Sequence, residues 1–327
     1  MGRLRIATFN LENLGEEAGG SGLKERITIL RPQLQRLDAD ILCLQEVNAQ
    51  EIPGLHRRAL TALNQLLEHT HYAAYSRIAT AGQGDSCFVD RHNQVILSRQ
   101  PIVASREIWH EFVPPLRYSP VTAADDAAVI EARFDRPILY AAIELPNSRT
   151  LHLLNLHLKA PLAVPIPGQK RPVSGWSSVA GWSEGFFLAS IKRASQALEA
   201  RVFLDRLFDK EPDALVAVCG DFNADSREVP VRLILGTDED TGTAGLLPSL
   251  MTALEHNVPV EQRYSVTHGG QRIMLDHLLV SPALLALHGR TEIHNEQLVD
   301  EVLGSSRDSR SAGSFHAPVV AEFTLPS

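Results

Sequence analysis

The amino-acid sequence predicts an α/β protein in which two packed β-sheets are flanked by helices. Short apolar runs recur along the chain, and most of them end in a cluster of polar residues. They alternate with segments whose apolar residues have helical spacing, and the strand-like runs outnumber the helical ones. That balance favours two packed sheets with helices outside them. The chain has 327 residues, 44% of them hydrophobic, which is ample for a large buried core.

Seven runs have the length and composition of strands. They cover residues 5–9, 41–45, 95–98, 151–158, 214–219, 275–280 and 319–323. Helical spacing occurs at residues 27–37, where Pro32 places a helix start or a kink, and again at 59–67 and 191–202. Length alone would suggest about two domains. Because the polar motifs run from one end of the chain to the other, we predict a single domain over residues 1–327, with a loop insertion at about 160–185 that is rich in Pro, Gly and Ser.

The charge balance and the cysteines limit the class of protein. The chain has 39 acidic and 31 basic residues, a formal charge of −8. A protein that coats nucleic acid by neutralising phosphates is usually basic, so this balance argues against a non-specific DNA coater. Three cysteines cannot form a disulfide framework, and Cys43 and Cys219 lie in apolar runs, where we expect buried thiols.

The same evidence gives an expected location. The first strand motif begins at Arg5, which leaves no room for a cleavable signal, and no apolar run is long enough to span a bilayer. We expect a cytoplasmic protein without a membrane span, and we predict no protein partner.

Polar side chains follow the predicted strands, often two residues apart. On an extended strand, residues i and i+2 face the same side, so such pairs point at one spot. These residues are Asn10 with Glu12, Asn155 with His157 and Lys159, and Asp221 with Asn223; single residues in similar positions are Glu46, Asp276 and His316.

Each of these residues also has an ordinary structural interpretation. Asp221 and Asn223 could form an Asx-type turn, and a single His such as His316 is more often structural than catalytic. Glu46 alone would be a surface carboxylate. Asp276 is harder to explain in this way, because a carboxylate inside the apolar run at 275–280 needs a partner if it is buried.

The combination of motifs resembles the endonuclease/exonuclease/phosphatase superfamily, which includes deoxyribonuclease-like and apurinic-endonuclease-like metal-dependent phosphoesterases. The matching strings occur in the family's order and cover nearly the whole chain. They are RIATFNLEN (5–13), ILCLQEV (41–47), NQVILSRQPI (93–102), LLNLHLKA (153–160), VCGDFNAD (218–225), LDHLLVSP (275–282) and SFHAPVVAEF (314–323). The resemblance implies a four-layer α/β/β/α sandwich of two mixed β-sheets flanked by helices.

The resemblance also implies roles for the matching residues. Glu46 resembles the main ligand of one Mg²⁺ (or Mn²⁺) ion, with Asn10 and Glu12 supporting that ion directly or through water. His157 resembles a phosphate-contacting His, and Asn223 a residue that holds a non-bridging oxygen. Asp276 and His316 would form an Asp–His pair, in which the carboxylate fixes the tautomer of the ring.

Two points stay open at this stage. Asp221 would orient or deprotonate the attacking water, and both Asp221 and His316 are candidates for the base. The family usually has Asp immediately before its last His, whereas this chain has Phe315, which cannot bind a metal. Without that acid a second metal ion would lack a ligand, so the sequence suggests one ion, unless Asp308 substitutes for the missing acid.

The segment from Lys159 to Arg193 is locally basic and suggests a lid that binds an anionic substrate. We expect Lys159, Lys192 and Arg193 to contact the substrate, the last two from the first turns of a helix that follows the loop. Trp176 and Trp182 would stack on a base or cover a lipid. The alternative is a solvated loop whose tryptophans pack back on the core.

The sequence therefore predicts a divalent-metal-dependent phosphoesterase that hydrolyses a phosphodiester, as a nuclease does, by direct in-line attack of water. Its partner would be a phosphate-ester substrate, including nucleic acid as one option. One alternative is a phosphomonoesterase acting on a small phosphorylated molecule or a phospholipid headgroup. Another is a weak or inactive binding protein that keeps the fold.

Overall fold

The computed structural model describes residues 2–16, 20–55, 57–81, 88–123, 128–171, 175–237, 241–304 and 313–326. Two six-stranded sheets form its centre. The first has the order β17 (His288–Ile293), β18 (Val319–Leu325), β1 (Gly2–Leu14), β2 (Ile41–Val47), β6 (Asn93–Ser98) and β5 (Ser76–Ala79). The second has the order β13 (Thr252–Ala253), β16 (Asp276–Val280), β12 (Leu215–Asp221), β11 (Thr150–His157), β10 (Ile138–Glu144) and β7 (Ile102–Ile108).

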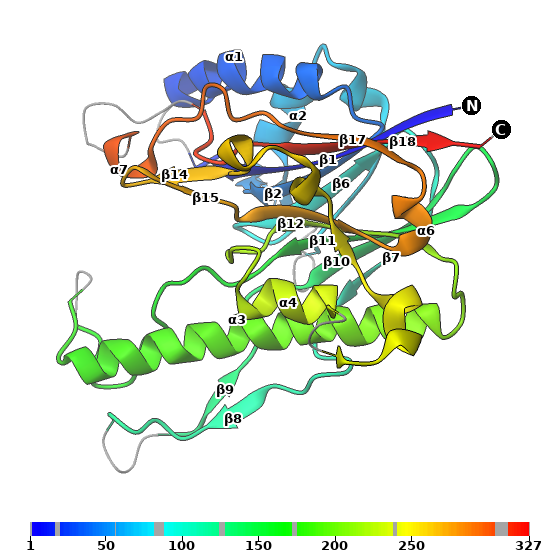
Figure 1. Ribbon diagram of the computed structural model, residues 1–327. Coiled ribbons are helices and arrows are strands. Elements are labelled where there is room, and N and C mark those ends of the chain that lie inside the picture. Colours follow the sequence, from blue (N-terminus) through cyan, green and yellow to red (C-terminus); the bar gives the residue numbers. More distant parts are fainter. Residues whose placement is uncertain are drawn as a thin grey trace.

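Helices cover the outer face of each sheet, which gives the four layers seen in Figure 1. On the first sheet lie α1 (Gly20–Leu37) and α2 (Thr61–Leu67), and on the second lie α3 (Val179–Phe208) and α4 (Val229–Leu235). The predicted four-layer α/β/β/α fold class is confirmed. Helix α1 begins at Gly20, well before Pro32, which lies inside the helix rather than at its start.

Shorter elements complete the described chain. They are the hairpins β3 (Gln50–Glu51) with β4 (Arg58–Ala59), β8 (Leu116–Tyr118) with β9 (Ile130–Ala132), and β14 (Val266–His268) with β15 (Gln271–Ile273); the short helices α6 (Pro282–Leu285) and α7 (Glu301–Gly304); and the 3-10 turns η1 (His71–Ala74), η3 (Ala244–Ser249), η4 (Leu254–Asn257) and η5 (Val260–Gln262).

The core has three layers because the side chains of each strand alternate between two apolar environments. In β1, Leu4 and Ile6 face the space between the sheets, whereas Ala7 and Phe9 face α1 and α2. The sheets therefore need apolar residues on both faces, which explains why the strands appear in the sequence as nearly continuous apolar runs. Both Cys43 and Cys219 are free thiols buried between the sheets, as expected.

Helix α3 defines the end of the predicted loop insertion. The helix begins at Val179, so the irregular segment is shorter than the expected 160–185. Glycines explain the difference, because Gly181 and Gly185 resemble loop residues in sequence but serve close packing here. A Cβ atom on Gly185 would lie 2.3 Å from the carbonyl oxygen of Val164. Within the described residues, no helix has both the length and the apolar character needed to cross a membrane.

Candidate active site

Strand pairing brings the predicted catalytic residues together at the ends of three neighbouring strands. In the second sheet, His157 of β11 lies opposite Asp221 of β12, and Asp221 lies opposite Asp276 of β16. In the first sheet, Asn10 of β1 pairs with Gln45 of β2, the residue before Glu46. Each sheet therefore contributes one side of the site.

Several site residues have a backbone conformation that only glycine adopts without cost. The φ angles are +47° at Glu12, +57° at Glu46 and +49° at Asn223. Left-handed conformations at non-glycine residues cost free energy and are concentrated at functional sites. In this chain they turn the backbone at the strand ends, so Glu12 does not simply follow Asn10 on an extended strand.

The amide of Asn10 links two carboxylates that come from different sheets. Its Nδ2 donates to Glu46 Oε1 at 3.1 Å and to Asp221 Oδ2 at 2.9 Å. Its Oδ1 accepts a hydrogen bond from the backbone amide of Glu12 at 2.8 Å, and the backbone amide of Asn13 donates to Glu46 Oε2 at 3.0 Å. Asn10 therefore acts in this structure as a donor that positions the carboxylates.

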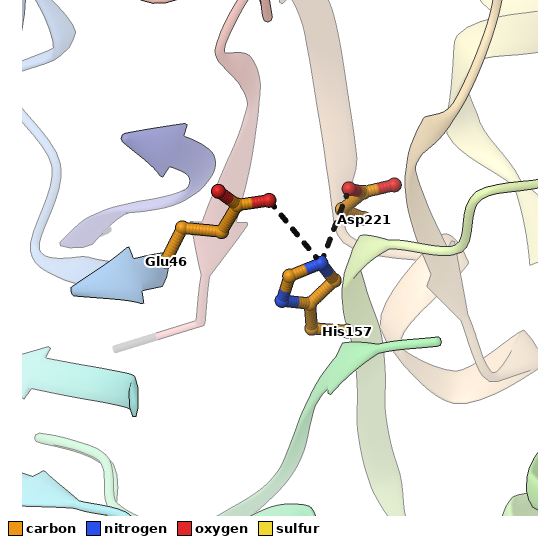
Figure 2. A group of neighbouring side chains, drawn as sticks. All are labelled: Glu46, His157 and Asp221. Carbon is orange, nitrogen blue, oxygen red and sulfur yellow. Dashed lines mark ion pairs between the residues drawn. The ribbon is translucent and has the colours of Figure 1, made fainter. Parts of the chain in front are cut away.

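The ring of His157 lies between the same two carboxylates (Figure 2). Its Nε2 is 3.5 Å from Glu46 Oε1 and 3.6 Å from Asp221 Oδ2. Its Nδ1 contacts the guanidinium of Arg136. Because a guanidinium can only donate, Nδ1 must accept, and the ring proton is on Nε2. Burial and the positive charge of Arg136 hold the pKa of His157 well below its usual range, so the ring is neutral.

Asp276 and His316 form the expected pair. His316 Nδ1 lies 2.7 Å from Oδ2 of Asp276, which is fully buried. Burial alone would lower the pKa of His316, but the carboxylates of Asp276 and Asp221 outweigh that effect and raise it to about 10. The hydroxyl of Ser265 accepts a hydrogen bond from the Asp276 amide at 3.0 Å and so fixes the strand at this point.

Asp221 is the most constrained carboxylate of the site. Burial raises its pKa to about 7, and the neighbouring charge of Asp276 acts in the same direction. Oδ1 of Asp221 accepts a hydrogen bond from the backbone amide of Asn223 at 2.8 Å, which is the Asx-type turn considered above. The amide Nδ2 of Asn223 donates to the Leu158 carbonyl at 3.0 Å. Turn formation and participation in the site therefore coexist in these two residues.

The site fits a divalent cation. Two groups of side chains among the described residues could hold a metal ion: Glu46, His157 and Asp221, and Asp221, Asp276 and His316. Oδ1 of Asp276 is buried without a hydrogen-bond partner in the described residues. The two groups contain three carboxylates, of which Asp221 and Asp276 are buried and Glu46 is half-buried. Neighbouring carboxylates repel one another, and oxygen-rich groups of this kind suit Mg²⁺ or Mn²⁺.

Glu12 is held at the edge of this cluster. Its Oε2 accepts a hydrogen bond from the backbone amide of Phe315 at 2.7 Å, and burial raises the pKa of its carboxyl group. Glu12 belongs to neither of the two candidate metal groups. Asp308, considered as a substitute for the acid missing at position 315, lies outside the described residues.

The three basic residues predicted to bind substrate lie close together, but not as expected. Lys159 and Lys192 both contact Asp135, at 3.0 and 2.7 Å. Arg193 is buried, and its guanidinium donates to the carbonyl of Lys159 at 3.0 Å. Arg193 therefore holds the backbone of Lys159 in place. The prediction that Lys192 and Arg193 lie in the first turns of a helix is wrong, because α3 begins at Val179.

The two tryptophans have different environments. Trp176 packs against Gly185, and the ammonium group of Lys170 lies 4.8 Å from the centre of its ring. Trp182 is 42% exposed and stacks on Phe186. Trp176 thus follows the alternative interpretation, in which the ring packs back on the protein, while Trp182 keeps an exposed ring on α3.

The sequence patterns did not indicate several residues of the site. Arg136 contacts His157, and His92 lies with its ring centre 6.0 Å from that of His157 while contacting Asn13 at 2.8 Å. His277 is buried behind the site, where it contacts Glu255. The only feature of the sequence that indicates His277 is its place beside Asp276 in an apolar strand. Arg136 and His92 lie just before strands, and no spacing motif in the sequence includes them.

Comparison with known proteins agrees with this architecture. Residues 7–305 match the model of the endonuclease/exonuclease/phosphatase family. The chain belongs to this family. Members of the family are metal-dependent hydrolases of phosphate esters, so the chain is an enzyme that acts on phosphate ester bonds. No curated protein sequence matches it.

Solved structures of this family share the fold at low sequence identity. Humanized D. rerio TDP2 has a TM-score of 0.56 and 16% identity over 99% of both chains. A mannosyl-6-phosphatase from Bacteroides thetaiotaomicron has a TM-score of 0.58 and 16% identity; the match covers 98% of this chain and 100% of the phosphatase. The 3′ phosphatase NExo from Neisseria, bound to a product DNA hairpin, has a TM-score of 0.51 and 17% identity; the match covers 98% of this chain and 100% of NExo.

Proposed function

We propose that this enzyme hydrolyses a phosphodiester by direct in-line attack of water and uses one Mg²⁺ (or Mn²⁺) ion. The observation that carries the proposal is the convergence of Glu46, Asp221 and the Nε2–H of His157 on one spot beside the Asp276–His316 pair. A bound divalent ion would neutralise charge that builds up on the phosphate in the transition state.

The residues of the chain then have distinct tasks. Glu46 is the main ligand of the ion, and Asn10 and Glu12 hold the surrounding groups in place. The neutral ring of His157 donates its Nε2 proton to a non-bridging oxygen, since Nδ1 is already occupied by Arg136. Asn223 contacts another oxygen of the phosphate.

The attacking water needs a group within hydrogen-bond reach that accepts its proton. Asp221 and His316 lie in one group of side chains that could hold a metal ion, so both are near the attacking water. The raised pKa of His316, about 10, makes its ring a cation, and Asp221 is therefore the group that can accept the proton. Asp276 keeps the ring of His316 in a fixed orientation. Direct attack predicts inversion at phosphorus, so retention of configuration during hydrolysis of a substrate chiral at phosphorus would contradict the proposal.

Phosphomonoesterase activity on a small molecule is the second candidate. It is favoured by the two phosphatases among the similar structures, one described as a mannosyl-6-phosphatase and one bound to product DNA. A catalytically inactive binding protein is the third, and the difference from the family pattern at Phe315 is what favours it.

One assay separates the three candidates. Turnover of bis(p-nitrophenyl) phosphate and of p-nitrophenyl phosphate is measured with Mg²⁺, with Mn²⁺ and with EDTA. Glu46→Gln removes the main ligand, while Glu51→Gln, whose side chain is 79% exposed, is the matched control. We expect metal-dependent diesterase activity that Glu46→Gln lowers by about a hundredfold or more and Glu51→Gln leaves unchanged. Preference for the monoester supports the second candidate, and no turnover on any ester supports the third.

A further inference from the structure

The space between the two sheets changes from apolar to polar just behind the active site. Leu151 and Leu153 of β11 face this space and belong to the apolar core. Asn155, two residues further along β11, faces the same side and is fully buried. His157 follows after two more residues. Asn155 therefore lies between the apolar core and the ring of His157.

Asn155 joins the second sheet to the first by three hydrogen bonds. Its Nδ2 donates to the Leu44 carbonyl of β2 at 3.1 Å and to the Val95 carbonyl of β6 at 3.2 Å. Its Oδ1 accepts a hydrogen bond from Nε2 of Gln45 at 2.7 Å. Because the two carbonyls can only accept, the group that faces them must be the NH₂ group, and the orientation of the amide is fixed.

The partners of Asn155 adjoin the residues that form the other side of the site. Gln45 precedes Glu46, and its Nε2 also donates to the hydroxyl of Thr8 at 3.0 Å. Thr8 lies two residues before Asn10 on β1. The side chains of Thr8, Gln45 and Asn155 are all fully buried. These three residues form a polar network that connects β1 and β2 to β11 directly behind the site.

A polar network at this place controls position more than stability. Apolar contacts between two sheets have no direction, so they hold the sheets together without fixing how one lies on the other. Hydrogen bonds depend on distance and angle, and a satisfied buried network selects one arrangement. A buried polar group adds little net stability over an apolar one. Catalytic groups need a fixed arrangement, because a misplacement of about 1 Å costs about a hundredfold in rate.

We propose that Asn155 is a positioning residue that sets the distance between Glu46 on the first sheet and His157 on the second. These side chains are 3.5 Å apart, and a phosphate that contacts both sides of the site requires a defined separation. Gln94 of β6 also joins the sheets, through the Pro137 carbonyl at 2.6 Å, but Asn155 lies on the same strand as His157. The inference rests on the proposed diesterase function and adds to it a residue that does not touch the substrate.

The kinetic test is Asn155→Leu, which keeps the number and branching of the side-chain heavy atoms and removes the polar ones. We expect kcat for bis(p-nitrophenyl) phosphate to fall about tenfold or more. KM should change by less than about threefold, because the substrate keeps its contacts and only the alignment needed in the transition state is lost.

Ser281→Ala is the matched control. Ser281 is also fully buried, and its hydroxyl accepts from the Val216 amide at 3.1 Å and donates to the Ala214 carbonyl at 2.8 Å. These contacts lie at the opposite end of β12 from Asp221. The control should lower the temperature of unfolding and leave kcat unchanged. An equal fall of kcat in both variants would show a general effect of lost stability and overturn the inference.

NMR gives a readout that does not depend on turnover. Glu46→Gln should shift the Nε2 signal of His157, because a charge 3.5 Å away is removed. In an Asn155→Leu background the same substitution should give less than about half of that shift, because the two groups have moved apart. A Ser281→Ala background should retain the full shift. An equal shift in all three backgrounds would overturn the inference.

Two further outcomes are informative. If Asn155→Leu does not fold, Asn155→Ser provides the same test, because a hydroxyl has one donor hydrogen and cannot serve both carbonyls. A wild-type protein without turnover, but with the expected loss of the NMR shift, would refute the proposed diesterase function and leave the positioning role of Asn155 in place.

Discussion

The buried pair of His277 and Glu255 gives a sharp prediction about stability. His277 contacts Glu255 Oε1 through Nδ1 at 2.5 Å and the Ala224 carbonyl through Nε2 at 2.8 Å. Because a carboxylate and a carbonyl can only accept, both ring nitrogens must donate, and His277 is an imidazolium. Both side chains have 0% exposure, so no water compensates for a lost charge. Removing one partner of a buried pair costs about 3–5 kcal/mol.

The perturbation is Glu255→Gln, which keeps the shape of the side chain and removes its charge. The matched control is Glu301→Gln, because Glu301 forms the same kind of pair with His268 at 2.8 Å, but with side chains 58% and 49% exposed. Surface pairs contribute about 0–1 kcal/mol. Urea unfolding at pH 6 should therefore give a loss several times larger for Glu255→Gln. Equal losses in the two variants would refute the argument that burial sets the magnitude.

The same pair should make stability depend on pH. Burial would lower the pKa of His277, but Glu255 and the Ala224 carbonyl outweigh it, and the pKa is raised above 6.5. A raised pKa in the folded state means that the stabilisation is complete below about pH 6.5 and is lost as pH rises through the folded-state value. The free energy of unfolding should decline over that range in the wild type. The decline should be smaller in Glu255→Gln.

Three further predictions concern the site. In ¹⁵N NMR spectra, His157 should carry its proton on Nε2, and Arg136→Met should shift the ring toward a mixture of tautomers; a proton on Nδ1 in the wild type would contradict the assigned contact. Gly220→Ala should destabilise the fold by about 4 kcal/mol or more in thermal unfolding, because φ is +136° there and a Cβ would lie 1.9 Å from the Leu156 carbonyl. Mg²⁺ at about 100 times its Kd should stabilise the protein by about 2.7 kcal/mol, whereas Glu46→Gln should show little of this effect.

The sequence predicts the central strands of the two sheets except β10, and it predicts none of the strands at their edges. Each of the seven predicted runs overlaps a strand of the two sheets and extends past it by at most one residue, because a strand covered on both faces must be apolar along its length. The edge strand β7 (Ile102–Ile108) was not predicted, since most of its residues are exposed. The helix α3 was predicted too short, because Gly181 and Gly185 have the composition of a loop and the packing that explains them is tertiary.

The site was predictable where it depends on strand ends and not where it depends on loops. Asp221 and Asp276 follow or begin buried strands, and the sheet register alone places them side by side. Arg136 and His92 approach His157 from segments between strands, and no spacing rule relates such residues to a distant strand. The same limit applies to Arg193, whose charge suggested a surface contact although its side chain supports Lys159.

The difference at Phe315 has a specific structural consequence. The residue contributes its backbone amide to Glu12, and that contact does not depend on the side chain. Replacing the family's acid by Phe therefore removes one carboxylate without releasing Glu12 from the site. Three carboxylates remain in the candidate metal groups: Asp221 and Asp276, which are buried, and Glu46, which is half-buried. Asp276 already contacts His316. Two carboxylates and their waters are enough for one Mg²⁺ ion, so we expect a one-metal site.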